Sequence, residues 1–459
     1  MRGQYESGPS VSDVEQFGYK EQLHRALTTR DLVVYGLMFI PPIAPYALFG
    51  IVWQSAKGMV PLAYFVGLVG MLFTAMSYAT LSRALPLAGS VYTYAHRGLH
   101  ETAGFFAGWL ILLDYILAPA LLYVISALAL KVILPGIPQW VCVVVFVGFN
   151  TVVNFLGIEF AARFNWYTLL LELACLALFV VCGVIALYFG HMGAGALTLK
   201  PVYDPAAFSL GTIIGATSVA VMSFLGFDGI STLSEESKSG SGSVGRATLI
   251  TLILVGVLFI GQTWIATDLA QGSTFGSPDT AFYEIVQRVG GNWLRLVTIG
   301  AVVLSAGVAN ASVSQAAVAR VLFAMARDGK LPGVLARIHP RFKTPYISNM
   351  VVAVISVIVG LIFEEHLGSL SRIVNFGALT AFLLLHLSVV NYFFIRQRSR
   401  AWVRHLVCPV CGLIVISWVL YEMDLSAKIL GIGWIAVGLL YYVVLATVTR
   451  KKPSLLPVK

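Results

Sequence analysis

Long, uninterrupted runs of apolar residues recur along nearly the whole chain, separated by short polar connections. A helix needs roughly 20 such residues to cross about 30 Å of hydrocarbon. The runs do not alternate between apolar and polar residues, so they do not fit the strands of a transmembrane β-barrel. The pattern predicts an all-α integral membrane protein with twelve transmembrane helices, near residues 32–54, 60–82, 104–133, 139–157, 165–190, 208–234, 247–269, 295–325, 347–363, 373–395, 405–421 and 429–449.

The sixth run is interrupted near its middle. Gly226, Asp228 and Gly229 lie within four residues of one another, although glycine weakens a helix and a carboxylate in hydrocarbon is energetically costly. Unwound backbone at bilayer depth is tolerated where it lines a cavity. This stretch is therefore predicted to be a broken helix at a binding site, and the other interpretation is a gently kinked structural helix.

The first run carries a matching interruption. Pro41, Pro42 and Pro45 each remove a backbone donor, and each would cost about 3 kcal/mol in a helix interior. Paired interruptions in the first and sixth runs indicate an inverted repeat of five plus five helices around a central site. The predicted divisions are a cytoplasmic tail (1–30), a first repeat (31–200), a second repeat (201–400), two further helices (401–450) and a cytoplasmic tail (451–459), with a flexible linker at 237–243.

The charges agree with a membrane protein. Hydrophobic residues make up 58% of the chain and charged residues 11%, against roughly 25% charged residues in soluble proteins. With both termini in the cytoplasm, 23 of the 30 lysines and arginines fall on that side, as the positive-inside rule requires. The net charge of +9 is therefore attributed to membrane orientation, and no nucleic acid is expected as a partner. The expected location is the plasma (inner) membrane, as a multi-pass protein without a cleaved signal peptide.

The charges after the eighth run, between residues 320 and 345, are interpreted either as a positive-inside anchor or as a gate clamp.

Three carboxylates are assigned to the interior of the predicted runs: Asp114, Glu172 and Asp228. Such groups face protein or water, either at functional sites or as structural hydrogen-bond partners. Because burial disfavours the charged form of a carboxyl group, Glu172 and Asp228 are candidate proton carriers. His386, alone in the tenth run, is a third candidate, although a lone buried histidine is more often a packing residue.

Cys408 and Cys411 have the C-x-x-C spacing of redox and metal sites. No second cysteine pair or histidine pair completes a tetrahedral set, so no metal is expected. The two cysteines are interpreted as small apolar residues at the start of the eleventh run, with a membrane thiol oxidoreductase as the rival interpretation. No Ser/His/Asp triad, Walker loop or dinucleotide-binding glycine pattern occurs in the sequence, so an enzyme is not expected.

Three motifs stand in order along the chain: Pro86-x-x-Gly-Ser-x-Tyr92, Gly226-Phe-Asp-Gly-Ile-Ser-Thr-x-Ser-Glu-Glu236, and Met325-Ala-Arg-Asp-Gly-x-x-Pro332 followed by Thr344-Pro345. With them, residues 20–450 resemble the amino acid/polyamine/organocation permease family. The resemblance is closest to its putrescine-importer-like branch, through Leu113-Asp-Tyr115 and Asn375-Phe-Gly-Ala-Leu379. It implies a LeuT-like fold, alternating access, and a substrate between the unwound parts of helices one and six, flanked by helices three, eight and ten.

The chain departs from that family at two positions. Members that carry amino acids have a glycine/serine stretch in helix one whose backbone donors hold the substrate carboxylate. Here Ile40-Pro-Pro-Ile-Ala-Pro45 replaces it and keeps fewer donors. Some proton-coupled members have a lysine in helix five where this chain has Glu172, so the role of the lysine is not transferred.

A site short of anion donors but supplied with carboxylates and aromatic faces suits an ammonium group. The expected function is proton-coupled secondary import of a polyamine, biogenic amine or cationic amino acid. The alternatives are a neutral amino acid permease or exchanger, because Ile43, Ala44 and Tyr46 retain amide donors, and a membrane sensor that binds without transporting. The predicted substrate-binding residues are Ile40, Pro41, Ile43, Ala44, Tyr46, Asp114, Tyr115, Phe224, Gly226, Phe227 and Asp228.

A proton gradient is preferred to a sodium gradient as the energy source. A sodium site would need clustered hydroxyls between helices one and eight. Ser312 and Ser314 are present, but the serine that the family places just before Arg320 is Ala319. No cofactor is expected. The expected partners are a small amine or amino acid and the lipid bilayer, in a monomer or homodimer.

Overall fold

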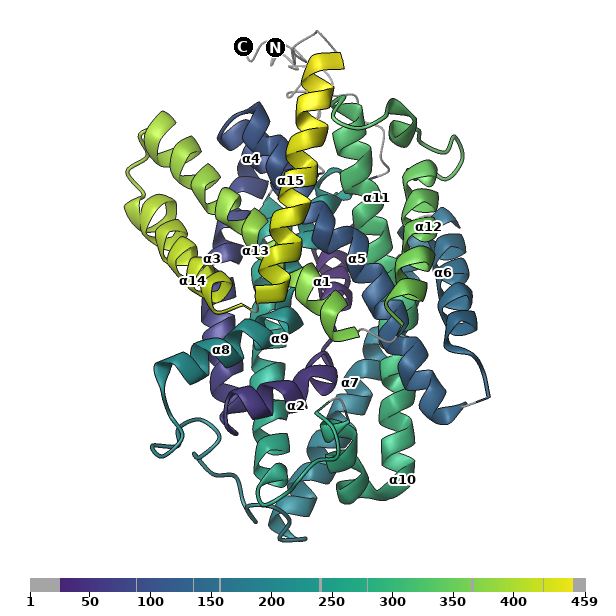
Figure 1. Cartoon of the computed structure of the whole chain (residues 1–459), viewed down its shortest axis with the longest axis vertical. Helices are drawn as coiled ribbons and strands as arrows, with labels where there is room; N and C mark the ends of the chain where they lie inside the picture. The colour runs from purple at the N-terminus through teal and green to yellow at the C-terminus, as the bar shows by residue number, and fades with distance from the viewer. Residues whose placement is uncertain are drawn as a thin grey trace, which may run out of the picture.

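The computed structural model describes residues 25–448 except 88, 135, 157, 239–241, 279, 365–366 and 424. Over these residues the chain is helical, and its extended pairing is one isolated bridge between Leu27 and Ser237. Residues 1–24 and 451–459 of the predicted tails, residues 449–450 before the second tail, and residues 239–241 of the predicted linker lie outside the described part. Figure 1 shows most helices running along the long axis of the molecule.

The elements follow one another as helices joined by short turns. Those of the first part are α1 (Thr29–Phe39), α2 (Pro45–Ser55), α3 (Val60–Ala84), α4 (Val91–Gly98), α5 (Glu101–Ile133), α6 (Gln139–Leu156) and α7 (Ile158–Tyr188). The middle part holds α8 (Leu210–Ala220), η2 (Val221–Phe224), η3 (Phe227–Glu236), α9 (Gly242–Ala270), α10 (Ala281–Leu304), η4 (Ser305–Asn310) and α11 (Ala311–Arg327). The last part holds η5 (Gly333–Ala336), α12 (Tyr346–Ile362), α13 (Leu367–Val389), η6 (Val390–Arg396), η7 (Val403–Val407), α14 (Cys408–Glu422) and α15 (Leu425–Val448).

Ten helices of the described residues are long and apolar enough to cross a membrane. The first predicted run is not among them, because it is split into α1 and α2 of 11 residues each. The ninth run is the shorter apolar helix α12, of 17 residues. The all-helical membrane class is thus confirmed, and the count of twelve crossings stays a prediction.

The start of α1 has a local cause. The Thr28 hydroxyl accepts from the Asp31 amide at 3.3 Å, and the Asp31 carboxylate accepts from the Thr28 amide at 2.9 Å. This reciprocal pair is a capping box, which satisfies donors that a helix start leaves free. It sets the first residue of α1 slightly before the apolar run itself.

The connection after α3 contains a turn and a short helix. Gly89 and Ser90 turn the chain with φ of 108° and 52°. The following residues then form the short helix α4, which packs against α5 and α13. Tyr92 and Tyr94 of α4 are buried in those contacts, so tertiary packing makes this connection a helix.

Two helix pairs carry much of the interior: α3 lies along α9, and α5 lies along α13. α15 takes little part in the interior, because 11% of the residues in its most apolar stretch are buried, whereas the share for α5 is 72%. α15 contacts α5 through Trp109 and Trp434, whose rings lie 4.7 Å apart. Each indole N–H donates to the backbone carbonyl of the other residue, at 2.9 and 2.8 Å. The last helix is therefore peripheral to the helices that enclose the site.

Candidate functional site

The first interruption lies between α1 and α2. α1 ends at Phe39, Ile40 has φ −120° and ψ 88°, and α2 begins with Pro45 at its first position. Proline is well placed there because the first amide of a helix has no partner to lose. Pro41 and Pro42 prevent α1 from continuing. The chain is thus unwound where the three prolines predict it.

The second interruption lies between α8 and η3. Leu225 is extended, with ψ 141°, and Gly226 has φ 114°, a conformation that suits glycine. A Cβ atom at Gly226 would lie 2.7 Å from the carbonyl oxygen of Phe39. The second interruption therefore packs directly on the end of α1, and both requirements select glycine.

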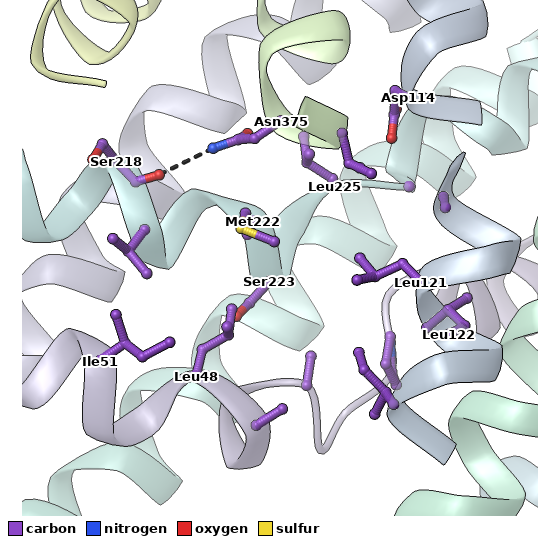
Figure 2. A pocket seen from close by; sticks show the side chains of 18 of the residues that line it. Leu48, Ile51, Asp114, Leu121, Leu122, Ser218, Met222, Ser223, Leu225 and Asn375 are labelled. Atoms are coloured by element: carbon purple, nitrogen blue, oxygen red, sulfur yellow. Dashed lines mark hydrogen bonds between the residues drawn. The ribbon is translucent and has the colours of Figure 1, made fainter. Parts of the chain in front are cut away.

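A cavity of about 690 Å³ lies beside these interruptions. Figure 2 shows its wall, to which α2, α5, α8 and α13 contribute. Most of the wall is aliphatic, and such a volume suits a small ligand. Among the lining residues that the structure describes, the charged side chains are Asp114 and Glu422, and there is no lysine, arginine or histidine. Ser55, Gly211 and Glu422 are exposed, so the cavity opens to the surface at that end.

Asp114 points toward the cavity from α5 (Figure 2). It is 4% exposed. Within the described part of the chain, no hydrogen bond or ion pair to its carboxylate is observed. A buried carboxylate without a partner is unfavourable unless something else compensates it. Asp114 is therefore the group in this wall best placed to bind a cation.

Asp228 does not line the cavity. It is fully buried, and its Oδ2 accepts a hydrogen bond from the Tyr115 hydroxyl. Tyr115 does line the cavity, as Asp114 does. Asp228, which the sequence placed at the centre of the site, thus lies behind the cavity wall, whereas Asp114 is part of that wall.

The other predicted binding residues divide in the same way. Pro41, Ile43, Ala44 and Gly226 line the cavity. The remaining four lie behind its wall and are buried: Ile40, Tyr46, Phe224 and Phe227. The three aromatic residues among them pack on other rings, with Tyr46 stacked on Phe282, Phe224 near Phe259 and Phe227 near Phe382. They shape the wall from behind.

Glu172 lies on α7, fully buried and outside the cavity lining. Neither of its carboxylate oxygens has a hydrogen-bond partner among the described residues. α7 packs against η4, a π-helical segment in which Ser305 and Ala306 line the cavity. Glu172 thus lies on a helix that packs against a segment of the cavity wall, and π-helical segments are frequent at functional sites.

His386 is also fully buried and does not line the cavity. Its Nδ1 pairs with the Ser77 hydroxyl at 2.9 Å and its Nε2 with the Thr74 hydroxyl at 3.2 Å. Both ring nitrogens therefore have partners on α3. This arrangement matches the packing interpretation of a lone intramembrane histidine.

Asn375 is a lining residue that the sequence motif contained but the predicted site omitted. Its Nδ2 donates to the Ser218 carbonyl at 3.1 Å (Figure 2). Its Oδ1 is buried without a partner in the described residues. The amide cannot be turned round, because two oxygens would then face each other. The sequence signal for Asn375 as a site residue was its polar side chain within a predicted apolar run. Aliphatic lining residues such as Leu121 have no such signal.

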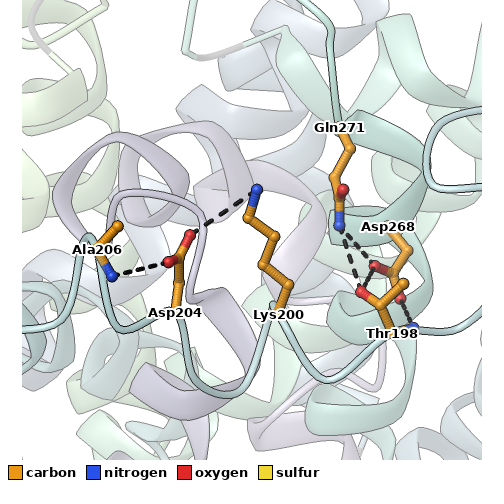
Figure 3. Close-up of polar contacts among 6 residues, drawn as sticks. All are labelled: Thr198, Lys200, Asp204, Ala206, Asp268 and Gln271. Carbon is orange, nitrogen blue, oxygen red and sulfur yellow. Dashed lines mark hydrogen bonds and ion pairs between the residues drawn. The ribbon is translucent and has the colours of Figure 1, made fainter.

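The assignment of three carboxylates to the predicted runs was wrong. Asp268 is a fourth, in the last turn of α9, and it is fully buried. It accepts from the Thr198 amide at 2.9 Å, the Thr198 hydroxyl at 2.6 Å and Gln271 Nε2 at 2.9 Å (Figure 3). Asp268 thus fastens the loop between α7 and α8 to the end of α9, a structural task apart from the cavity.

The end of the molecule opposite the cavity mouth is held by ion pairs. Glu236 pairs with Arg320 in a buried contact, and Glu235 pairs with Arg327 at 3.1 Å. Lys330 pairs with Glu101, and the Tyr92 hydroxyl donates to Asp328 at 2.7 Å. These contacts join η3 and α5 to the end of α11. Of the two interpretations of these charges, the arrangement favours the clamp.

The predicted sodium and thiol residues have ordinary surroundings. The Ser312 hydroxyl donates to Asn154 Oδ1 at 3.3 Å, and Ser314 lines the cavity. Cys408 is buried at the start of α14, and both it and Cys411 are free thiols. Among the described residues, no group of three or more histidine, cysteine, aspartate or glutamate side chains is arranged to hold a metal ion.

Comparison with known proteins shows where similar chains occur. Residues 42–446 match the family model described as amino acid permease. The chain is 34% identical, over 96% of both chains, to the low-affinity putrescine importer PlaP of Escherichia coli K12. It is 27% identical to the branched-chain amino acid permease BcaP of Bacillus subtilis, over 95% of this chain and 94% of that protein. It is also 27% identical to the methylthioribose transporter of Bacillus subtilis, over 92% and 93% of the two chains.

Proposed function

Since the chain belongs to the amino acid permease family, whose members are transporters and not enzymes, we propose that it imports a small amine-bearing solute by secondary active transport. The solute is a polyamine, a biogenic amine or a cationic amino acid. The observation that carries this proposal is the Asp114 carboxylate, which faces a cavity whose described lining has no basic side chain, and which has no partner in the described chain. An ammonium group supplies the missing charge and the missing hydrogen-bond donors.

Asparagine at position 114 tests the proposal. Asp114→Asn keeps the size of the side chain and removes its charge, so uptake of labelled putrescine into proteoliposomes is expected to fall about 10- to 100-fold, as for loss of a hydrogen bond to a charged group. Asp204→Asn is the matched control, because Asp204 does not line the cavity and pairs at 3.9 Å with Lys200 in the loop before α8 (Figure 3). Unchanged uptake in Asp114→Asn would contradict the proposal. Binding without uptake by the unmodified protein would instead identify a sensor.

The proposed mechanism is alternating access around the two interruptions, with twelve crossings and a five-plus-five inverted repeat. In support, α2 and α8, the segments that flank the interruptions on the mouth side, pack on each other and lie across the long axis in Figure 1. With both termini in the cytoplasm of an inner-membrane protein, the cavity mouth faces outward and the ion pairs of Glu235, Glu236 and Lys330 close the inner side. The described conformation would then be the one that receives substrate from outside.

Proton coupling is proposed to use Glu172. A carboxyl group that is fully buried without a partner is more stable when neutral, so its protonation state depends on whether water reaches it. Opening and closing of the neighbouring cavity wall at η4 would change that access. Sodium coupling has less support, because the Ser312 hydroxyl is already bound to Asn154.

A neutral amino acid permease is the second candidate. Its support is the similarity to proteins named branched-chain amino acid permeases and the largely aliphatic wall of the cavity. Uptake of leucine by the reconstituted protein, unaffected by an excess of amines, would favour it over the first proposal.

A further inference from the structure

The first interruption offers almost no backbone donor to an anion. Three of residues 40–46 are prolines, which have no N–H. The Ile40 amide donates to the Gly36 carbonyl at 2.9 Å, the Ala44 amide to Pro41 at 2.9 Å and the Tyr46 amide to Ile43 at 3.0 Å. Ile43 is left as the residue of this stretch whose amide has no observed acceptor. Of the three amides that could bind the carboxylate of a neutral amino acid, those of Ala44 and Tyr46 are therefore already hydrogen-bonded.

Two backbone amides at the second interruption are also occupied. The Leu225 amide donates to the Met222 carbonyl at 3.2 Å, and the Gly229 amide to the Gly226 carbonyl at 2.9 Å. The Asp228 carboxylate is buried behind this segment, and its charge opposes the approach of a second carboxylate.

Most side-chain donors in the cavity wall are also occupied. The Tyr115 hydroxyl donates to the Asp228 carboxylate, and the Asn375 amide nitrogen donates to the Ser218 carbonyl. The Ser218 hydroxyl donates to the Gly215 carbonyl. The Ser223 hydroxyl is hydrogen-bonded to that of Tyr64, and the Thr212 hydroxyl to that of Ser209. The Ser305 hydroxyl accepts from Asn310 Nδ2 at 3.0 Å. Among the described lining residues, the hydroxyls without an observed partner are those of Ser55 and Ser314, of which Ser55 lies at the exposed mouth.

The unoccupied groups in the wall are mainly acceptors. Asn375 Oδ1 is buried without a donor from the described chain, and no hydrogen bond from the described chain to the Asp114 carboxylate is observed, although both residues line the cavity. With Glu422 at the mouth and no basic side chain in the described part of the lining, the potential in the cavity also favours cations. Two separate acceptors suit a solute with an amino group at each end.

From this inventory, and resting on the proposed function, we infer that the cavity accepts amines that lack a carboxylate and rejects the amino acids that carry one. A carboxylate that leaves water for this wall finds neither a cation nor a set of amides, and such an unpaired charge is strongly unfavourable. Decarboxylated amines are thus the substrate class, and ornithine, lysine and arginine are excluded from it.

The test compares solutes that differ by a single carboxylate. Putrescine and ornithine form one pair, and cadaverine and lysine form another. Competition is measured against labelled putrescine uptake in proteoliposomes, together with thermal stabilisation of the purified protein by each unlabelled solute. We expect each amino acid to need more than about tenfold the concentration of its amine. A smaller ratio in either pair would overturn the inference.

Ornithinamide separates charge from size, because it has nearly the volume of ornithine but no carboxylate. It is expected to compete at least about tenfold better than ornithine. If it competes as poorly as ornithine, the exclusion is steric and the inference about missing donors is wrong. The proposed function fails separately, when no amine stabilises the protein or competes and leucine does both.

Discussion

At the scale of single residues, three buried carboxylates of this chain have different surroundings and so different expected tasks. Asp228 has a hydroxyl donor in Tyr115, and Asp114 has none but faces the cavity. Glu172 has no hydrogen-bond donor among the described residues and does not line the cavity. Burial alone therefore does not identify the residue that contacts a substrate. What distinguishes Asp114 is an unmet need for a partner at a place that a solute can reach.

Glu172→Gln tests the proton-carrying role. Glutamine fills the same space but cannot take up and release a proton, so we expect uptake to lose its acceleration by an inward proton gradient while putrescine still binds to the purified protein. Uptake is compared with and without a proton ionophore over a range of external pH. His386→Gln is the matched control and is expected to keep the gradient dependence, because both nitrogens of His386 pair with hydroxyls. Gradient-driven uptake that persists in Glu172→Gln would exclude this residue as the carrier.

At the scale of elements, the two interruptions form one unit. The Phe39 carbonyl at the end of α1 lies against Gly226, and the ring of Phe39 lies against Gly229. Pro45 starts α2 while Pro41 and Pro42 keep it separate from α1. The cavity wall at this point thus depends on glycine in one segment and proline in the other.

Gly226→Ala is expected to destabilise the protein and impair uptake. Alanine at φ 114° is strained, and its Cβ would lie 2.7 Å from the Phe39 carbonyl oxygen, so a loss of about 1–3 kcal/mol is expected. Thermal unfolding of the purified protein measures it. In the control, Gly261→Ala, the new Cβ meets open space on helix α9, and the change should stay within about 0.5 kcal/mol. Equal effects at both positions would contradict the role given to the second interruption.

At the scale of the whole molecule, the cavity opens at one end and ion pairs close the other. The buried pair of Glu236 and Arg320 matters most, because removing one partner leaves an uncompensated charge and costs about 3–5 kcal/mol. Such a penalty falls on the described conformation and favours conformations in which that end opens to water.

Glu236→Gln is therefore expected to reduce access from the mouth side. Access is measured with Ser218→Cys, a position in the cavity wall, as the rate of labelling by a membrane-impermeant maleimide above the background of the five native thiols. The double variant Glu236→Gln/Arg320→Met removes both charges and should recover thermal stability, which separates a conformational shift from misfolding. Labelling that is unchanged or faster in a stable Glu236→Gln protein would disprove the clamp.

The sequence by itself determined the membrane class, the positions of most apolar helices and the two interruptions. These are local properties: the length of an apolar run, three prolines in seven residues, and glycine beside a carboxylate each constrain the backbone where they stand. The motifs also identified the family that the comparisons support. The short helix α4 was missed, because its burial depends on α5 and α13 and not on its own sequence.

Only the tertiary structure decided which side chains share the cavity. Asp114 and Asp228 are both acidic residues in apolar runs. Their neighbours in sequence do not indicate that a tyrosine hydroxyl donates to Asp228, whereas Asp114 faces the cavity without such a donor. The same holds for Asn375, whose orientation is fixed by a carbonyl 157 residues away, and for Asp268, which holds a loop. Hydrogen-bond partners distant in sequence set the availability of a polar group, and such pairings exist only after the helices pack.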